Sequence, residues 1–218
     1  SSVSGVTSSS ATISSSVTSD GGATVTERGV VYSTSSNPTT SNSKIVSGSG
    51  LGEFKCTIKS LSYATTYYVR AYAKNSAGTV YGNEITFTTS PILPTVSAST
   101  VTNLTSSSAT ISSSVTSDGG AVVTERGIVY STSSNPTIDN ATKVVIGSGN
   151  FACSLSSLSY ATTYYVRSYA VNEIGVAYGE EISFTTLAIL PTVGTSSVSN
   201  VTSSSATISS SVVSDGGA

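Results

Sequence analysis

The chain has 218 residues, of which 9% are charged, and its formal net charge is −2. It has no basic run, so it lacks the cationic surface that nucleic-acid binding requires. No apolar stretch approaches the roughly 20 residues that cross a bilayer, which excludes a membrane span in this segment.

Serine and threonine take the place that lysine and glutamate usually occupy in soluble domains. Disordered segments are poor in aromatic and β-branched residues, whereas this chain has 12 Tyr and is dense in Val, Ile and Thr. It is therefore predicted to be folded and rich in strands. The low charge and the high Ser/Thr content favour an extracellular, cell-surface location.

A repeat runs through the whole chain. The decapeptide SSSATISSSV at 8–17 returns at 106–115 and again at 203–212. VTERG, SNPT, YATTYYVR and ILPTV each occur twice at matching positions. Only the stretch after SNPT changes in length between the copies, so it is predicted to be a surface loop or a loosely held edge strand.

The repeat predicts three parts in the chain. Residues 1–93 form a first repeat, residues 94–190 a second, and residues 191–218 bring the first two strands of a truncated third. Two strands alone make at best a marginal hairpin. The third part is therefore either a window cut from a longer array or a strand pair that completes a neighbouring chain.

Seven short strands and no helix are predicted in the first repeat. In chain order they cover 2–7, 11–17, 27–34, 44–46, 53–61, 66–75 and 83–89. SDGGA supplies a turn after the second strand, since its glycines accept positive φ. Seven short strands separated by turns over about 100 residues predict an all-β chain of tandem antiparallel Ig-like sandwiches in a linear array.

Alternation within these strands predicts the core. One face of each strand carries apolar residues: Val30, Tyr32, Phe54, Cys56, Ile58, Tyr67, Val69, Ala71, Ala73, Ile85 and Phe87. Cys56 and its counterpart Cys153 lie in this pattern, so both are interpreted as core thiols. A disulfide between inward-facing residues of different domains does not suit disulfide geometry.

The run LSYATTYYVRAYAKNSAGTVYGNEITFTT at 61–89 resembles the second half of a fibronectin type III domain. That resemblance implies that Tyr67 and Tyr164 are tyrosine-corner residues, each with a buried ring and a hydroxyl bonded back to the backbone. The family's early Trp is missing, and smaller residues such as Ile13 would take its place. ERGVVYSTSSNPT also resembles tandem fibronectin-like repeats of large bacterial surface proteins, in particular those of Bacteroidota.

Two connectors follow the seventh strand, SPILPTVS at 90–97 and LAILPTVG at 187–194. Pro94 and Pro191 fix φ and restrict the residue before them. Short connectors of this composition are stiff, unlike Gly/Ser tethers. A rod with a fixed step per repeat is expected.

A stripe of tyrosine and arginine is predicted on the outward face of the sixth strand. Its members are Tyr68, Arg70, Tyr72, Tyr165, Arg167 and Tyr169. Such a stripe either stabilises its own sheet through cross-strand pairs, or forms a contact face that holds sugars or a partner chain by stacking and cation–π contact.

No catalytic residue, cofactor site or metal site is predicted, because His is absent and no phosphate loop or nucleophile elbow occurs. Asp20, Asp118 and Asp215 in the SDGGA turns are interpreted as turn residues, with a calcium site as the alternative. N-x-S/T triplets at 103, 140 and 200 are candidate glycosylation sites.

The chain is thus expected not to be an enzyme. It is interpreted as a structural repeat segment of a long extracellular filament or adhesin, a semi-rigid rod or fibre. Its expected partners are neighbouring repeats, identical chains in a fibre, and surface glycans or proteins. The alternatives are spacer modules of a secreted polysaccharide-degrading enzyme, or a module that itself binds glycan or protein.

Overall fold

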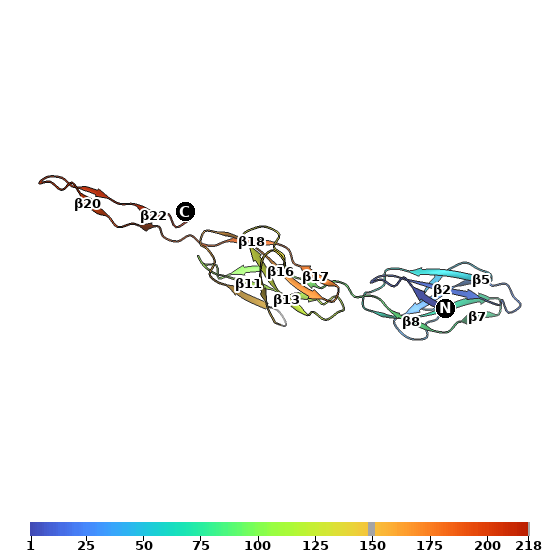
Figure 1. Ribbon diagram of the computed structural model, residues 1–218. Coiled ribbons are helices and arrows are strands. Elements are labelled where there is room, and N and C mark those ends of the chain that lie inside the picture. Colours follow the sequence, from blue (N-terminus) through green and yellow to red (C-terminus); the bar gives the residue numbers. More distant parts are fainter. Residues whose placement is uncertain (148–150, 218) are drawn as a thin grey trace. The chain divides into compact units, whose positions relative to one another are not determined.

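The computed structural model describes residues 1–147 and 151–217 (Figure 1). These residues form antiparallel sheets, and none of them is helical, so they include no helix that could cross a membrane. The predicted all-β class is confirmed, and the pairing is consistent with a β-sandwich. Contacts divide the chain into two compact units, Ser1–Ile92 with Gly119–Ala121, and Leu93–Asp118 with Val122–Ala218.

The first repeat folds into two antiparallel sheets. Its strands are β1 (Ser2–Ser4), β2 (Ala11–Val17), β3 (Glu27–Ser33), β4 (Ser43–Val46), β5 (Gly52–Ile58), β6 (Thr66–Asn75), β7 (Gly78–Tyr81) and β8 (Ile85–Thr88). One sheet has the order β1-β2-β5. The other has the order β4-β3-β6-β7, and β8 also pairs with β6. Figure 1 shows β2 and β5 side by side in this unit.

Both sheets contribute to one apolar core, as the alternation predicted. Its buried members are Ala11, Ile13, Val30, Phe54, Cys56, Ile58, Leu61, Tyr67, Val69, Ala71 and Phe87. Tyr32 and Ile85 pack against this core and are half-buried. Ile13 is completely buried in this core.

The second repeat has the same plan. Its strands are β9 (Thr95–Val96), β10 (Thr100–Thr102), β11 (Ala109–Ser113), β12 (Val115–Ser117), β13 (Glu125–Ser131), β14 (Thr142–Val145), β15 (Phe151–Leu155), β16 (Thr163–Asn172), β17 (Gly175–Tyr178) and β18 (Ile182–Thr185). The sheets are β10-β11-β15 and β14-β13-β16-β17, with β18 on β16. Ile111 and Tyr164 occupy the core positions of Ile13 and Tyr67.

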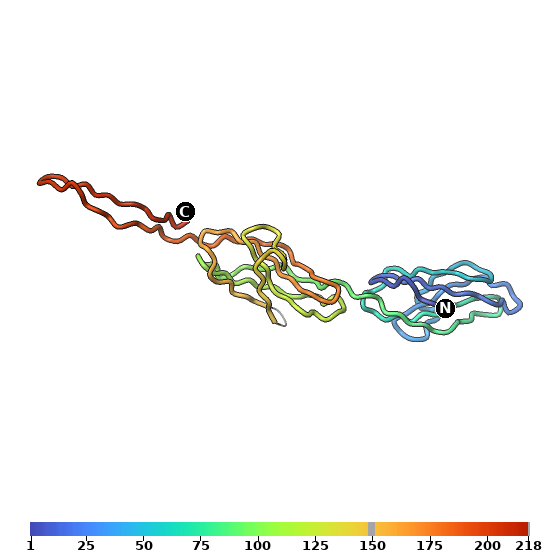
Figure 2. Tube along the Cα trace, in the orientation of Figure 1, coloured from blue at the N-terminus to red at the C-terminus, as the bar shows by residue number. Residues whose placement is uncertain are grey.

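The third part is a two-stranded ribbon. β19 (Thr192–Val193) pairs with β22 (Val212–Ser214), and β20 (Ser197–Ser199) pairs with β21 (Thr207–Ser209). Figure 2 traces it as the red C-terminal segment. Ile208, the counterpart of Ile13, is 69% exposed, because no second sheet covers it among the described residues.

Three predicted strands have wrong boundaries. The fifth strand, expected over 53–61, ends at Ile58, and Ser60 beyond it has a φ of 58°. The first strand, expected over 2–7, ends at Ser4, since Gly5 turns the chain with a φ of 58°. The seventh, expected over 83–89, covers only Ile85–Thr88 and is preceded by β7. β7 arises because Asn75 and Gly78 form a tight hairpin, in which the Asn75 Oδ1 accepts the Ala77 N–H at 2.9 Å.

The two predicted connectors are partly strand. Thr95–Val96 and Thr192–Val193, expected to link domains, pair as β9 and β19 with the ends of the strands that follow them. The stretch of variable length contains β4 and β14. Among the described residues each of them pairs with one neighbouring strand, which confirms the edge-strand alternative. Residues 148–150 of that stretch lie outside the described residues.

Both cysteines are free thiols. Cys56 is buried in the core of the first repeat, as predicted, whereas Cys153 is half-buried at the edge of the second. Burial raises the pKa of both thiols above the ordinary value. Raised pKa values and burial make these thiols structural rather than reactive.

Candidate functional site

A tyrosine near the start of β6 is hydrogen-bonded to the turn that precedes this strand. The Tyr67 ring is buried and stacks on Phe87, with ring centroids 5.7 Å apart. Its hydroxyl accepts a hydrogen bond from the Ser62 N–H at 3.0 Å. In the second repeat the Tyr164 hydroxyl accepts the Ser159 N–H, also at 3.0 Å. Each tyrosine therefore ties its strand to the preceding turn.

A buried threonine closes the same turn from the other side. The Thr89 hydroxyl donates to the Ser62 carbonyl at 2.6 Å and accepts the Thr65 N–H at 2.9 Å. Thr186 makes the equivalent contacts in the second repeat. The sequence did not predict these threonine contacts. The one sequence feature that could have indicated them is the Thr-Thr pair that ends both repeats.

The six residues of the predicted contact face lie on β6 and β16, on the side opposite the core. Four of them, Tyr68, Arg70, Tyr165 and Arg167, are half-buried. Tyr72 and Tyr169 are 2% and 0% exposed. A ring without exposed area offers nothing to a ligand, so the contact-face prediction is wrong for these two residues.

A glycine on the neighbouring strand makes room for each buried ring. Tyr72 lies beside Gly29 on one side and Tyr81 on the other. A Cβ added at Gly127, the counterpart of Gly29, would lie 3.0 Å from the Tyr169 ring. The glycine of the repeated ERG triplet is therefore part of the packing of this sheet face.

Arg70 is used within its own sheet. Its guanidinium lies 4.8 Å from the centroid of the Tyr81 ring, and its Nε donates to the Gly82 carbonyl at 3.0 Å. Arg167 makes the same two contacts in the second repeat, at 4.5 Å and 3.1 Å. These cation–π pairs and hydrogen bonds favour the interpretation that the stripe stabilises the sheet.

A small charged network completes this face. The Tyr72 hydroxyl donates to Glu27 at 2.6 Å, and the Lys44 ammonium pairs with the same carboxylate at 2.9 Å. The Tyr72 hydrogen bond and Lys44 lower the pKa of Glu27. Burial, with the bond to Glu27, raises the pKa of Tyr72. Glu125 and Tyr169 repeat the arrangement in the second repeat.

This network predicts a loss of stability in acid. A carboxyl whose pKa is lower in the folded state stabilises the fold above its unfolded pKa of about 4.3, and the contribution disappears as pH falls through the folded value. Urea unfolding of the chain is therefore expected to show a lower midpoint at pH 3 than at pH 6. The double variant Glu27→Gln with Glu125→Gln should lose part of this pH dependence.

The exposed Glu53 supplies the matched control. Glu53→Gln should keep the pH dependence of the unmodified chain. If the double variant and the unmodified chain lose the same stability between pH 6 and pH 3, the network makes no pH-dependent contribution.

Two of the three SDGGA aspartates, Asp20 and Asp215, accept hydrogen bonds within their own turns. The Asp20 Oδ1 accepts the Gly22 N–H at 3.0 Å, and Gly21 and Gly22 have φ of 65° and 84°. Asp215 makes the same bond in the third part, at 2.9 Å. Within residues 1–147 and 151–217, no three His, Cys, Asp or Glu side chains gather to hold a metal ion. The hydrogen bonds of Asp20 and Asp215 agree with the turn interpretation of these two residues.

The three N-x-S/T triplets lie at the surface. Asn103, Asn140 and Asn200 are all exposed. Asn103 and Asn200 adopt a positive φ of 50°, which Asn tolerates better than most residues. Their exposure is compatible with modification of the side-chain amide.

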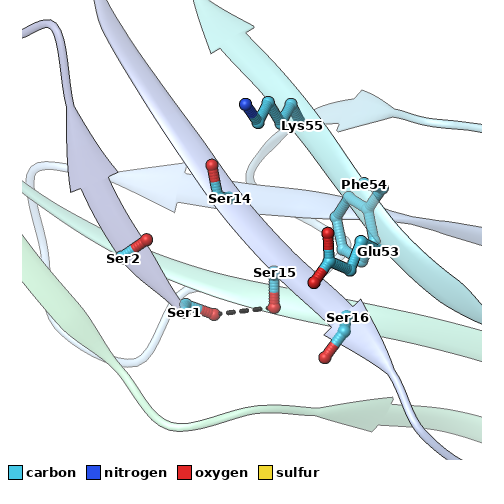
Figure 3. Close-up of a pocket in the computed structure, with 8 residues that line it drawn as sticks. All are labelled: Ser1, Ser2, Ser14, Ser15, Ser16, Glu53, Phe54 and Lys55. Atoms are coloured by element: carbon cyan, nitrogen blue, oxygen red, sulfur yellow. Dashed lines mark hydrogen bonds between the residues drawn. The ribbon is translucent and has the colours of Figure 1, made fainter.

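A hollow of about 680 Å³ is lined by residues of β1, β2 and β5 and by Ser1 (Figure 3). Its lining residues are Ser1, Ser2, Ser14, Ser15, Ser16, Glu53, Phe54 and Lys55. The hydroxyls of Ser1 and Ser15 are 2.9 Å apart and share a hydrogen bond. The lining thus presents serine hydroxyls beside the charged side chains of Glu53 and Lys55.

No protein-family model matches this sequence, and a search of curated proteins found no significant match. The fold and the contacts above define an all-β protein of repeated antiparallel sheets. In the first two repeats, Tyr67, Arg70, Thr89 and their counterparts make contacts within their own repeat.

Proposed function

We propose that this chain is a structural repeat segment of a long extracellular surface filament or adhesin, in which tandem fibronectin type III-like sandwiches form a semi-rigid rod. The main observation behind the proposal is that the second repeat has the same architecture as the first. Sheet order, core positions, the tyrosine turn and the Arg–Tyr pair all recur in the second repeat. A scaffold needs such recurrence, and the side chains of Tyr67, Arg70 and Thr89 make contacts within their own repeat.

The seven-stranded plan has support in the pairing. β7 and β8 both pair with β6 and follow one another along it, so they act as one interrupted strand. Counted in this way, the first repeat has three strands in one sheet and four in the other. The hydroxyl bonds of Tyr67 and Tyr164 support the resemblance to fibronectin type III domains. The boundaries 1–93, 94–190 and 191–218 stay a prediction.

A stiff connection between repeats is part of the proposal. β8 ends at Thr88 and β9 begins at Thr95, so residues 89–94 alone connect the last strand of one repeat with the first of the next. Pro91 and Pro94 fall within this short stretch, where each fixes φ. A short segment with two prolines has few conformations compared with a Gly/Ser tether.

Labelling of intact cells tests the proposed function. Antibodies raised against residues 1–218 should label the outside of unlysed cells of the source, and immunogold electron microscopy should show label along extended structures. Lysed cells serve as the control for total antigen. Label that is accessible only after lysis would contradict a surface filament.

A further inference from the structure

Three residues of the second SDGGA turn belong to the compact unit of the first repeat. That unit combines Ser1–Ile92 with Gly119–Ala121. Gly119 is buried, and its carbonyl accepts the Ile92 N–H at 2.9 Å. The turn is therefore part of the packing of a repeat whose own sequence does not include it.

The next residue, Gly120, lies against the turn that precedes β6. A Cβ added at Gly120 would lie 2.1 Å from the Ala64 methyl carbon and 3.3 Å from the Tyr63 ring. A separation of 2.1 Å is far shorter than any contact that real Cβ atoms make, so one of the two turns would have to move. The absence of a side chain at Gly120 is what allows the two turns to meet.

The third SDGGA turn makes the same contact within the second compact unit. Gly216 is buried, and its carbonyl accepts the Ile189 N–H at 2.9 Å. A Cβ added at Gly217 would lie 2.3 Å from the Ala161 methyl carbon and 3.3 Å from the Tyr160 ring. Two copies of the sequence thus form one contact with nearly identical distances.

The alanine of this contact has an unfavourable backbone conformation. Ala64 and Ala161 have φ of 46° and 47°, in the left-handed region that glycine adopts at lower cost. A methyl group is thus present where its own backbone disfavours it. This methyl is the nearest neighbour of the position at which Gly120 or Gly217 lacks a Cβ. A contact made by the methyl accounts for alanine at this position.

The connector joins the same contact through hydrogen bonds. The Ser90 carbonyl accepts the Ala64 N–H at 3.2 Å, and two residues later the Ile92 N–H donates to Gly119. In the second unit, Leu187 and Ile189 make the equivalent bonds to Ala161 and Gly216 at 3.2 Å and 2.9 Å. Three segments therefore meet at each contact: the Tyr-Ala turn, the connector and the SDGGA turn.

We propose that this contact, which we call the turn lock, couples the stability of successive repeats. Its members are Tyr63, Ala64, Gly119 and Gly120 in the first unit, and Tyr160, Ala161, Gly216 and Gly217 in the second. The SDGGA turn of one repeat is the specific partner of the Tyr-Ala turn of the repeat before it, and the paired glycines are the residues that this partner requires. In arrays of repeats, such contacts between neighbours add to the stability that each repeat has alone. The inference deepens the proposed function and rests on it in treating the repeats as units joined in series.

Amide hydrogen exchange of the 218-residue chain, measured by NMR, tests the turn lock, because the Ile92 and Ile189 amides donate directly into its two copies. Gly120→Ala should speed exchange of the Ile92 amide at least about fivefold, since the added methyl overpacks the contact. Exchange of the Ile189 amide should not change. Gly217→Ala should give the reverse pattern, with Ile189 faster and Ile92 unaffected.

A compensating substitution separates the contact from backbone strain. Ala64→Gly deletes the facing methyl, so in a chain that carries it Gly120→Ala should change Ile92 exchange by no more than about twofold. Strain at the positive φ of Gly120 would not be relieved by a change at residue 64. Ala161→Gly should likewise compensate Gly217→Ala.

Gly50→Ala is the matched control within the first unit. Gly50 has a φ of 77°, close to the 81° of Gly120, and a Cβ added there meets no atom of the described residues within 4 Å. This control should leave Ile92 exchange unchanged. The proposal is overturned if Gly120→Ala behaves like Gly50→Ala, or if Ala64→Gly does not compensate it. Cell-surface labelling tests location alone, so failure of the turn lock and failure of the proposed function are distinguishable.

Discussion

Ile13→Ala is expected to destabilise the first repeat by about 2–5 kcal/mol, whereas Ile208→Ala should have almost no effect. Both isoleucines lie in the same decapeptide, SSSATISSSV. Ile13 is completely buried between the two sheets, and Ile208 is 69% exposed. Truncation leaves a cavity only where neighbouring side chains surround the missing atoms. Ile111→Ala, at another completely buried site, should match Ile13→Ala within the second repeat.

Hydrogen exchange measured by mass spectrometry on the full chain checks this prediction, because peptides of the three parts can be followed separately. Faster exchange should be confined to the repeat that carries the substitution. Equal effects of Ile13→Ala and Ile208→Ala would show that the first repeat does not bury this position as described.

Gly29→Ala is expected to destabilise the first repeat by about 1–3 kcal/mol, toward the upper end of that range. A Cβ at this position would lie 2.0 Å from the Ile45 carbonyl oxygen. That oxygen is backbone, so strand β4 must move away from β3 to admit the new methyl group. Gly127→Ala should act equally on the second repeat, where the Val144 carbonyl oxygen would lie 1.9 Å away.

Gly82→Ala is the matched control on the same sheet. The nearest atoms to its added Cβ lie 3.8 Å away, at Ala71, which is ordinary van der Waals contact. Thermal unfolding and amide exchange of β4 should therefore change for Gly29→Ala and stay near the unmodified values for Gly82→Ala. If Gly29→Ala is as stable as Gly82→Ala, the close approach of β4 at Gly29 is not maintained in solution.

The strands that carry the core could be predicted with good accuracy. β2 and β6 cover the predicted 11–17 and 66–75, and Phe54, Cys56 and Ile58 face the core as alternation required. Prediction failed where a strand depended on a distant partner. The connector at 90–97 contains β9 because the end of β12 pairs with it, and no local pattern distinguishes that strand from a linker.

The candidate site was harder to predict than the core. Alternation placed Tyr72 and Arg70 on the side opposite the core, which is where they lie. The alternation pattern gives no information on which residues cover that side of the sheet. Gly29 leaves space for the Tyr72 ring, and the Tyr81 ring from β7 makes a cation–π contact with Arg70. Residues that suggested a contact face therefore contact neighbours in their own sheet.

By itself, the sequence determined an all-β chain, its repeat, and the inward face of each main strand, because side-chain direction in a strand alternates with a period of two residues. Only the tertiary structure decided which of these residues are buried. Ile13 and Ile208 share one local sequence and differ in exposure because, among the described residues, a second sheet covers Ile13 and none covers Ile208. Burial depends on neighbours that come from distant parts of the chain, and local periodicity does not identify these neighbours.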